Sequence, residues 1–252
     1  MAKRQFKAES KRLLDLMVNS IYTHKEIFLR EIISNASDAC DKLCYQALTD
    51  DAVGMSRKDF KIEIKVDKEH RTLTVSDNGI GMDKEDLENN LGVIASSGSY
   101  KFKQEVGDDA KDTDVIGQFG VGFYSAFMVA DHITVVTRKY GTDAAWMWQS
   151  SGADGYTITE CERDAVGTDI IMHIKADTDD EKYSEFLESW RLQELVRKYS
   201  DYIRFPIRME VSKTRRKEGS PDDKPEYETY QEVETLNSMV PIWQRRKSSV
   251  KP

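Results

Sequence analysis

Three polar side chains near the start of the sequence have the types and spacing needed for chemistry on a bound ligand. Residues 29–39 read Leu-Arg-Glu-Ile-Ile-Ser-Asn-Ala-Ser-Asp-Ala, and in a helix Glu31, Asn35 and Asp38 fall at i, i+4 and i+7 on one narrow stripe. Taken alone, such a stripe is most often only a solvated helix face. The carboxylate of Glu31 could nevertheless activate a water molecule, and the amide oxygen of Asn35 could be a ligand of magnesium.

A further candidate carboxylate stands at a glycine-rich break in the chain. The segment Asp77-Asn-Gly79-Ile-Gly81 follows a strand-like run, and its glycines allow the backbone to turn tightly beside a ligand. An ionised carboxylate only accepts hydrogen bonds, so Asp77 could take one from the exocyclic amine of adenine, whereas the carbonyl oxygen of guanine would be repelled. An ordinary Asp-Asn-Gly turn is the alternative interpretation.

Two more motifs complete a possible nucleotide site. Gly117-x-x-Gly120-x-Gly122 precedes a short apolar run, and backbone N–H groups exposed before a helix attract phosphate. Its spacing differs from both the P-loop and the dinucleotide-binding glycine motif. Gly167-Thr168 begins a strand-like run and offers a hydroxyl that could lie near the base-reading carboxylate. Together, the motifs predict a site for a base, its phosphates and a magnesium ion.

Helical periodicity indicates the elements that position these motifs. The polar stripe lies in a predicted helix from Lys25 to Leu48, whose other side is apolar and should be buried. The other predicted helices are Glu9–Tyr22, Asp83–Asn89, Phe123–Val129 and Glu181–Tyr202. The weakly patterned segment Leu91–Thr113 is more typical of a mobile segment than of a core element.

Strand-like runs account for most of the remaining chain. They are Lys61–Val66, Thr72–Ser76, His132–Lys139, Ala144–Gln149, Tyr156–Cys161, Thr168–Ile174, Ile207–Val211 and Tyr227–Val233. The first two predict a hairpin, and the next four, joined by short turns, predict an antiparallel meander. The charged run Lys213–Glu226 has the composition of a flexible linker. We therefore expect a main domain over residues 1–212, a linker over 213–226, and a last strand with a further connection over 227–252.

Composition narrows the class of protein. The 252 residues include 37 Lys and Arg against 45 Asp and Glu, and a net charge of -8 disfavours nucleic acid as a partner. No apolar segment approaches the roughly 20 residues that a membrane span requires. The odd set Cys40, Cys44 and Cys161 favours a reducing compartment, so we expect a cytoplasmic protein without a membrane partner.

The motifs, in this order along the chain, carry a resemblance to a known superfamily. Glu31-x-x-x-Asn35, Asp77-x-Gly-x-Gly81, Gly117-x-x-Gly-x-Gly122 and Gly167-Thr168 resemble the nucleotide site shared by type II topoisomerases, MutL-type mismatch-repair proteins, sensor histidine kinases and the ninety-kilodalton heat-shock chaperones. The full sequences of the segments 25–39, 76–82 and 116–125 look specifically like those of the chaperones, in their bacterial form.

This resemblance implies a fold and a set of roles. The fold would be α/β (α+β) of the Bergerat ATPase type, a two-layer sandwich in which helices cover one face of a mixed, mostly antiparallel eight-stranded sheet. The ligands would be ATP or ADP with Mg²⁺. Glu31 would be the general base, Asn35 would hold Mg²⁺ through the phosphates, and Asp77 and Thr168 would bind adenine. The other residues around the nucleotide would be Asp38, Gly81, Met82, Asn90, Gly117, Gly120, Val121, Gly122 and Phe123.

The resemblance also implies moving parts and a longer protein. Leu91–Thr113 would be a lid over the nucleotide, and Phe6–Ser10 would be exchanged between two protomers in a closed state. A middle domain would supply an arginine for the γ-phosphate, so this region alone should hydrolyse ATP only weakly. The longer protein would be a homodimer that binds unfolded client proteins, whereas this region alone would be a monomer. Ser96 departs from the family because it stands where a lid lysine is usual; Lys101 or Lys103 could replace that charge.

Three other interpretations remain open from the sequence. A sensor kinase usually lacks a glutamate at the position of Glu31, because it transfers phosphate to histidine rather than to water. A topoisomerase or mismatch-repair ATPase keeps that glutamate, but the acidic balance of this chain and its chaperone-like motifs disfavour handling of DNA. The third alternative is an interaction module that nucleotide binding gates and for which hydrolysis is incidental.

Overall fold

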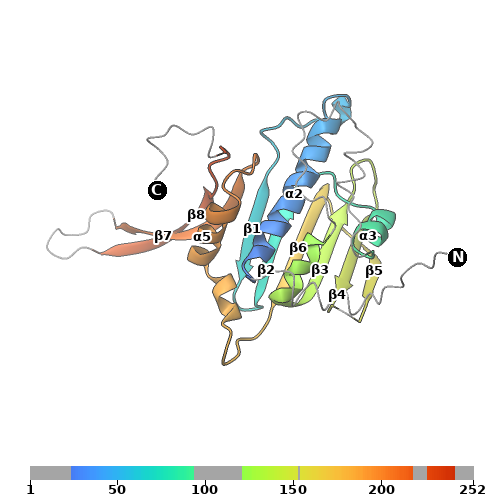
Figure 1. Cartoon of the computed structure of the whole chain (residues 1–252). Helices are drawn as coiled ribbons and strands as arrows, with labels where there is room; N and C mark the ends of the chain where they lie inside the picture. Colours follow the sequence, from blue (N-terminus) through green and yellow to red (C-terminus); the bar gives the residue numbers. More distant parts are fainter. Residues whose placement is uncertain (1–23, 94–120, 153, 218–225, 242–252) are drawn as a thin grey trace, which may run out of the picture.

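The computed structural model describes residues 24–93, 121–152, 154–217 and 226–241 (Figure 1). The predicted first helix, Glu9–Tyr22, and the predicted exchanged segment, Phe6–Ser10, lie outside these residues. The same is true of all but the beginning of the predicted lid. Among the described residues, no helix combines the length and the apolar character that crossing a membrane requires.

One eight-stranded sheet forms the centre of the molecule. Its strands are β1 (Ile62–Asp67), β2 (Thr72–Asp77), β3 (Ala130–Arg138), β4 (Ala145–Ser150), β5 (Tyr156–Cys161), β6 (Gly167–Ile174), β7 (Ile207–Arg216) and β8 (Tyr227–Thr235). They lie side by side in the order β5-β4-β3-β6-β2-β1-β7-β8. Only the β1–β7 pair is parallel, which confirms the expected mixed, mostly antiparallel sheet.

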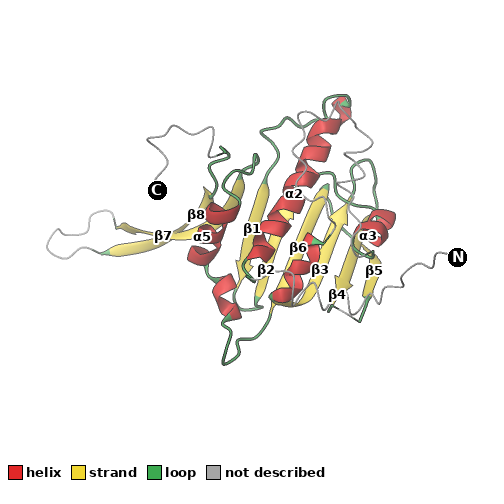
Figure 2. Ribbon diagram, viewed as in Figure 1, coloured by secondary structure: helices red, strands yellow, loops and turns green. Residues whose placement is uncertain are grey.

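Helices form a second layer on one face of this sheet (Figure 2). They are α2 (Ile27–Gln46), α3 (Lys84–Asn90) and α5 (Ser189–Tyr199), with the 3₁₀ helices η2 (Asp51–Val53), η4 (Gly122–Met128) and η5 (Tyr183–Leu187). The long helix α2 buries Phe28, Ile32 and Ile33 in the same core as Ile64 and Val75 of the sheet. Burial of this apolar side holds the helix on the sheet and fixes the direction of its polar stripe.

The predicted helix Glu181–Tyr202 is wrong as a single element. The chain instead forms η5 and then α5, with Glu188 between them in an extended conformation. The break allows η5 and α5 each to bury apolar side chains in the same core. Phe186 of η5 packs edge to face on Phe28 at 5.2 Å, while Leu192 and Val196 bury their side chains from α5.

The predicted meander of four strands is correct for β3, β4 and β5 but wrong for the fourth. Strand β6 crosses back and pairs with both β3 and β2. Burial explains this order, because β6 carries Ile170, Met172 and Ile174 into the core, whereas every residue of β5 is at least partly exposed. An apolar strand is stabilised in the middle of a sheet, and a polar strand is tolerated at its edge.

The predicted linker Lys213–Glu226 is wrong at its beginning, and residues 218–225 of it lie outside the described part of the chain. Strand β7 continues to Arg216, and its ladder with β8 reaches the pair Arg216–Tyr227. Opposite charges face each other across this hairpin, since Lys213 pairs with Glu232 and Glu234, and Arg215 pairs with Glu228. The charges that suggested a solvated linker therefore support a strand pair, and the expected boundary at residue 212 falls inside β7.

Candidate functional site

The Asp77 turn docks against the middle of α2. The backbone N–H of Ile80 donates to the carbonyl of Ala39 at 3.0 Å. A Cβ atom at Gly79 would lie 2.3 Å from the carbonyl carbon of Ala39, so a glycine is required for this approach. Because Ala39 follows Asp38, two of the predicted motifs meet here.

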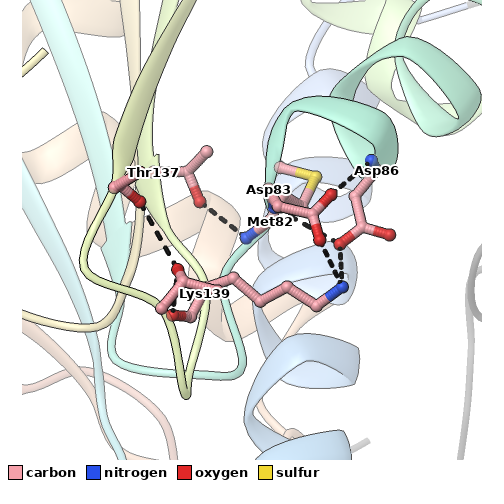
Figure 3. Close-up of polar contacts among 7 residues, drawn as sticks. Met82, Asp83, Asp86, Thr137 and Lys139 are labelled. Atoms are coloured by element: carbon pink, nitrogen blue, oxygen red, sulfur yellow. Dashed lines mark hydrogen bonds and ion pairs between the residues drawn. The ribbon is translucent and has the colours of Figure 1, made fainter. Parts of the chain in front are cut away.

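Asp77 and Thr168 face each other across the β2–β6 ladder, as the proposed base-reading pair requires. The Thr168 hydroxyl lies 3.0 Å from the hydroxyl of Thr137, which donates to the carbonyl of Gly167 at 3.1 Å. The backbone N–H of Met82 donates to the same Thr137 oxygen at 2.9 Å (Figure 3). Thr137 is fully buried and ties β3, β6 and the Met82 segment together, although no sequence motif marked it.

Glycine conformation and close packing also set the path after Asp77. Gly81 has a φ of 67°, and a Cβ atom there would lie 2.0 Å from the carbonyl oxygen of Arg138. The following Asp83 caps α3 through a capping box with Asp86. Lys139 pairs with both of these carboxylates at 2.7 Å, as Figure 3 shows. The segment that carries Met82 is therefore fastened to the end of β3 on both sides.

The end of the site that was predicted to bind the base contains buried charge. Asp77 is 7% exposed, and burial raises its pKa to about 7, while the Gly79 N–H, which donates to it at 2.9 Å, and the Arg163 guanidinium act in the opposite direction. Asp38 is also buried. Burial lowers the pKa of Lys42, one turn further along α2, and the carboxylates of Asp38 and Asp77 oppose this change. Lys42 is therefore a charged group near Asp38 and Asp77 that the sequence motifs did not reveal.

Glu31 lies at the other end of the stripe, against the last glycine of the third motif. Its Oε1 accepts a hydrogen bond from Nε of Arg30 at 3.0 Å. Its Oε2 faces Gly122, because a Cβ atom at that glycine would lie 2.4 Å from this oxygen. The hydroxyl of Ser125 donates to the carbonyl of Gly122 at 2.6 Å and stabilises the start of η4.

The other predicted residues have different positions. Asn35 is half-buried on α2 between Glu31 and Asp38, and Val121 is half-buried just before η4. Phe123 is buried in the core, edge to face with Trp148 at 5.4 Å. Asn90 is partly exposed at the end of α3, and Gly117 and Gly120 lie outside the described residues. The seven-residue separation of Glu31 and Asp38 corresponds to about 10 Å along the helix axis.

Comparison with known proteins identifies the family of this chain. Residues 22–168 match the family model described as "Histidine kinase-, DNA gyrase B-, and HSP90-like ATPase". The chain belongs to this ATPase family. Residues 185–229 also match the model described as "Hsp90 protein". The region 22–168 that matches the ATPase family model includes Glu31, Asp77, Gly122 and Thr168.

Curated members of the ATPase family include close relatives of this chain. It is 58% identical over 252 residues to the chaperone protein HtpG of Clostridium botulinum strain Langeland, and it covers 40% of that protein. It is also 58% identical over 251 residues to chaperone protein HtpG of Bacillus subtilis strain 168, covering 39% of it. The chain therefore spans about two fifths of the length of these HtpG relatives.

Proposed function

We propose that this chain is the ATP-binding and ATP-hydrolysing region of a chaperone of the HtpG type. The observation that carries the proposal is the position of α2 between two ends of one site. The turn after Asp77 is docked beside the middle of α2, and Thr168 lies opposite Asp77 in the β2–β6 ladder. Gly122 is in contact with Glu31, which lies eight residues before Ala39 on the same helix. The names of the curated relatives support a chaperone.

The base-reading end supports recognition of adenine. In its ionised form, Asp77 accepts a hydrogen bond from the exocyclic amine, and Thr168, held by Thr137, supplies a second polar contact. Guanine presents a carbonyl oxygen where adenine has its amine, so two acceptors would face each other. Asp38, Gly81, Met82 and Asn90 would complete the surroundings of the nucleoside in this proposal.

The other end supports hydrolysis. Oε2 of Glu31 is the oxygen on the Gly122 side, so it would take the proton from a water molecule that attacks the γ-phosphorus. The new O–P bond forms as the bond between the γ-phosphorus and the bridging oxygen breaks, which leaves ADP and phosphate. The Gly117–Phe123 segment would contact the phosphates through its backbone, with Gly120 and Val121 among its members.

The polar groups present fit Mg²⁺ held mainly by the nucleotide. No group of three or more His, Cys, Asp or Glu side chains that could hold a metal ion occurs in the part of the chain that the structure describes. Mg²⁺ often uses one or two protein oxygens together with substrate phosphates, and the Asn35 side-chain oxygen is the proposed protein ligand. When bound, the ion would neutralise charge on the phosphates.

Further features belong to the proposal for the longer protein. They are lid closure over the nucleotide, exchange of the N-terminal segment in a homodimer, an arginine from a middle domain, and binding of unfolded client proteins. The shared 58% identity with HtpG chaperones, over two fifths of their length, supports these features. In this proposal the separate region is a cytoplasmic monomer that hydrolyses ATP weakly, because it lacks the charge of that arginine.

Calorimetric titration of the chain with magnesium-ADP and magnesium-GDP tests the binding function. We expect ADP to bind, GDP not to bind, and an Asp77→Asn variant to lose ADP while its thermal unfolding remains cooperative. Equal binding of the two nucleotides would refute the assignment of Asp77. Hydrolysis is tested separately with Glu31→Ala in a chain that includes the following domain; unchanged turnover would refute the role of Glu31 and favour a module gated by nucleotide alone.

A further inference from the structure

Lys175 follows β6 and holds the C-terminal end of η4. Its half-buried side chain donates from Nζ to the main-chain oxygens of Phe127 at 2.7 Å and Met128 at 3.2 Å. Its backbone N–H donates to the carbonyl of Val129 at 2.9 Å. Carbonyl groups at the end of a helix lack partners within the helix and carry partial negative charge, so a cation stabilises this end.

Tyr183 in η5 connects Lys175 to the beginning of α2. The centre of its ring lies 5.7 Å from Nζ of Lys175 and 4.8 Å from Nζ of Lys25. Lys25 also donates to the Tyr183 hydroxyl at 2.9 Å and pairs with Glu181 at 2.6 Å. Lys25 stands two residues before α2 begins, so the two lysines and the ring between them link the end of η4 to the start of α2.

The opposite end of η4 meets α2 at Glu31. Gly122 is the first residue of η4, and it faces Oε2 of Glu31. The 3₁₀ helix spans seven residues, or about 14 Å at about 2 Å per residue. The core holds the middle of η4, because its residues from Phe123 to Met128 are buried. Such a short element has few hydrogen bonds of its own, so the polar contacts at its ends fix the exact position of each end. A shift at the Met128 end changes how the Gly122 end approaches Glu31.

We propose that Lys175 is a positioning residue for the phosphate end of the site and that it acts through η4. This inference rests on the proposed ATP function, because it assigns the Gly122 end to the phosphates. Without the ammonium group, the carbonyls of Phe127 and Met128 lose their donor, and the C-terminal end of η4 shifts while its apolar side chains stay in the core. Nucleotides with phosphates then lose affinity, whereas a nucleoside, held beside Asp77 and Thr168, does not.

The test compares ADP with adenosine in Lys175→Met, Lys175→Arg and the control Lys65→Met, which removes an exposed lysine from β1. ADP is titrated with magnesium by calorimetry, adenosine is measured by competition, and thermal unfolding confirms that each variant is folded. We expect Lys175→Met to weaken ADP about tenfold, in line with the loss of a charged hydrogen-bond donor. Adenosine should change less than about twofold, and Lys175→Arg should restore most of the ADP affinity.

Other outcomes contradict the inference. Equal weakening of ADP and adenosine would assign Lys175 a role in stability alone, and unchanged ADP affinity in folded Lys175→Met would remove its positioning role. If Lys175→Met does not fold, Tyr183→Leu removes the ring between the lysines, and the same comparison of ADP with adenosine decides. Failure of the wild-type chain to bind ADP would instead refute the proposed function, which distinguishes the two conclusions.

Discussion

In the proposed function, Asp77 makes adenine recognition depend on pH, and this dependence follows from the surroundings of its carboxylate. Burial raises its pKa from 3.8 to about 7, against the hydrogen bond from Gly79 and the positive charge of Arg163. Other charged groups that act on the same environment are Lys42 and Asp169. The ionised carboxylate accepts a hydrogen bond from the exocyclic amine of adenine more strongly than the protonated acid, whose carbonyl oxygen is a neutral and weaker acceptor. Affinity for the nucleoside should therefore rise as the pH rises through 7.

The size of the effect follows from the ionised fraction. With a pKa of about 7, roughly 9% of Asp77 is ionised at about pH 6 and roughly 91% at about pH 8, so the apparent affinity rises by at most about tenfold between them. Stability changes in the opposite direction, because the folded-state pKa lies above the unfolded one. This contribution to the free energy of unfolding is fully present below about pH 4 and is lost as the pH rises through 7, by at most about 4 kcal/mol.

Adenosine is the ligand for this measurement, since it has no phosphate group to titrate in the same range. Its dissociation constant is measured at several pH values between about 6 and 8 for the wild type, Asp77→Asn and Asp164→Asn, the last being a control at an exposed carboxylate. We expect the pH dependence in the wild type and the control but not in Asp77→Asn, which should also be the more stable protein at pH 8. An affinity that falls with rising pH would refute the reasoning.

Two further predictions concern buried polar contacts. Thr137→Val should lower the free energy of unfolding in urea by about 2–4 kcal/mol, because it leaves the Met82 N–H and a second buried partner unpaired; a loss no larger than that of Thr134→Val, on the same strand, would contradict this role. Hydrogen bonds from Tyr199, Lys198 and Arg191 lower the pKa of Glu26 to about 2. That stabilisation is present above about pH 4.5 and is lost as the pH falls toward 2, so Glu26→Gln should reduce stability at pH 7 by about 1–2 kcal/mol after solvent screening and flatten the acid side of the profile. Urea unfolding measured between about pH 7 and pH 3 checks this prediction. The same change of the unfolding free energy with pH in variant and wild type would contradict it.

The features visible from sequence are those that local physics controls. The apolar period of residues 27–46 specifies one helix and hence the stripe that carries Glu31, Asn35 and Asp38. Gly79 and Gly81 mark positions where another backbone comes within 2.3 Å of a would-be Cβ atom, so their type reports a tertiary approach. The helix and the turn that docks on it could therefore both be predicted from the sequence.

The features missed depend on contacts between distant segments. Thr137 belongs to an alternating strand in which one more threonine carries no signal, and it gains its role only when β6 inserts beside β3. Strand β6 inserts there because it is more apolar than β5. This difference is visible only when the two strands are compared, so neither segment predicts the order of the strands by itself. The charges of Lys213 and Arg215 likewise predict a solvated segment when they are considered alone. Their partners on β8 are visible only in the folded structure.

The two ends of the site differ in what holds them, and this difference locates where the protein can move. At the base-reading end, backbone meets backbone: Cβ atoms at Gly79, Gly81 and Gly167 would lie 2.0–2.3 Å from main-chain atoms of other segments. At the proposed phosphate end, Gly122 meets the end of a flexible glutamate side chain, and the C-terminal end of η4 is fastened through the side chain of Lys175. Side chains change rotamer at little cost, whereas closely packed backbones do not. A rearrangement on nucleotide binding should therefore occur between Gly122 and Glu31, while the adenine contacts remain fixed.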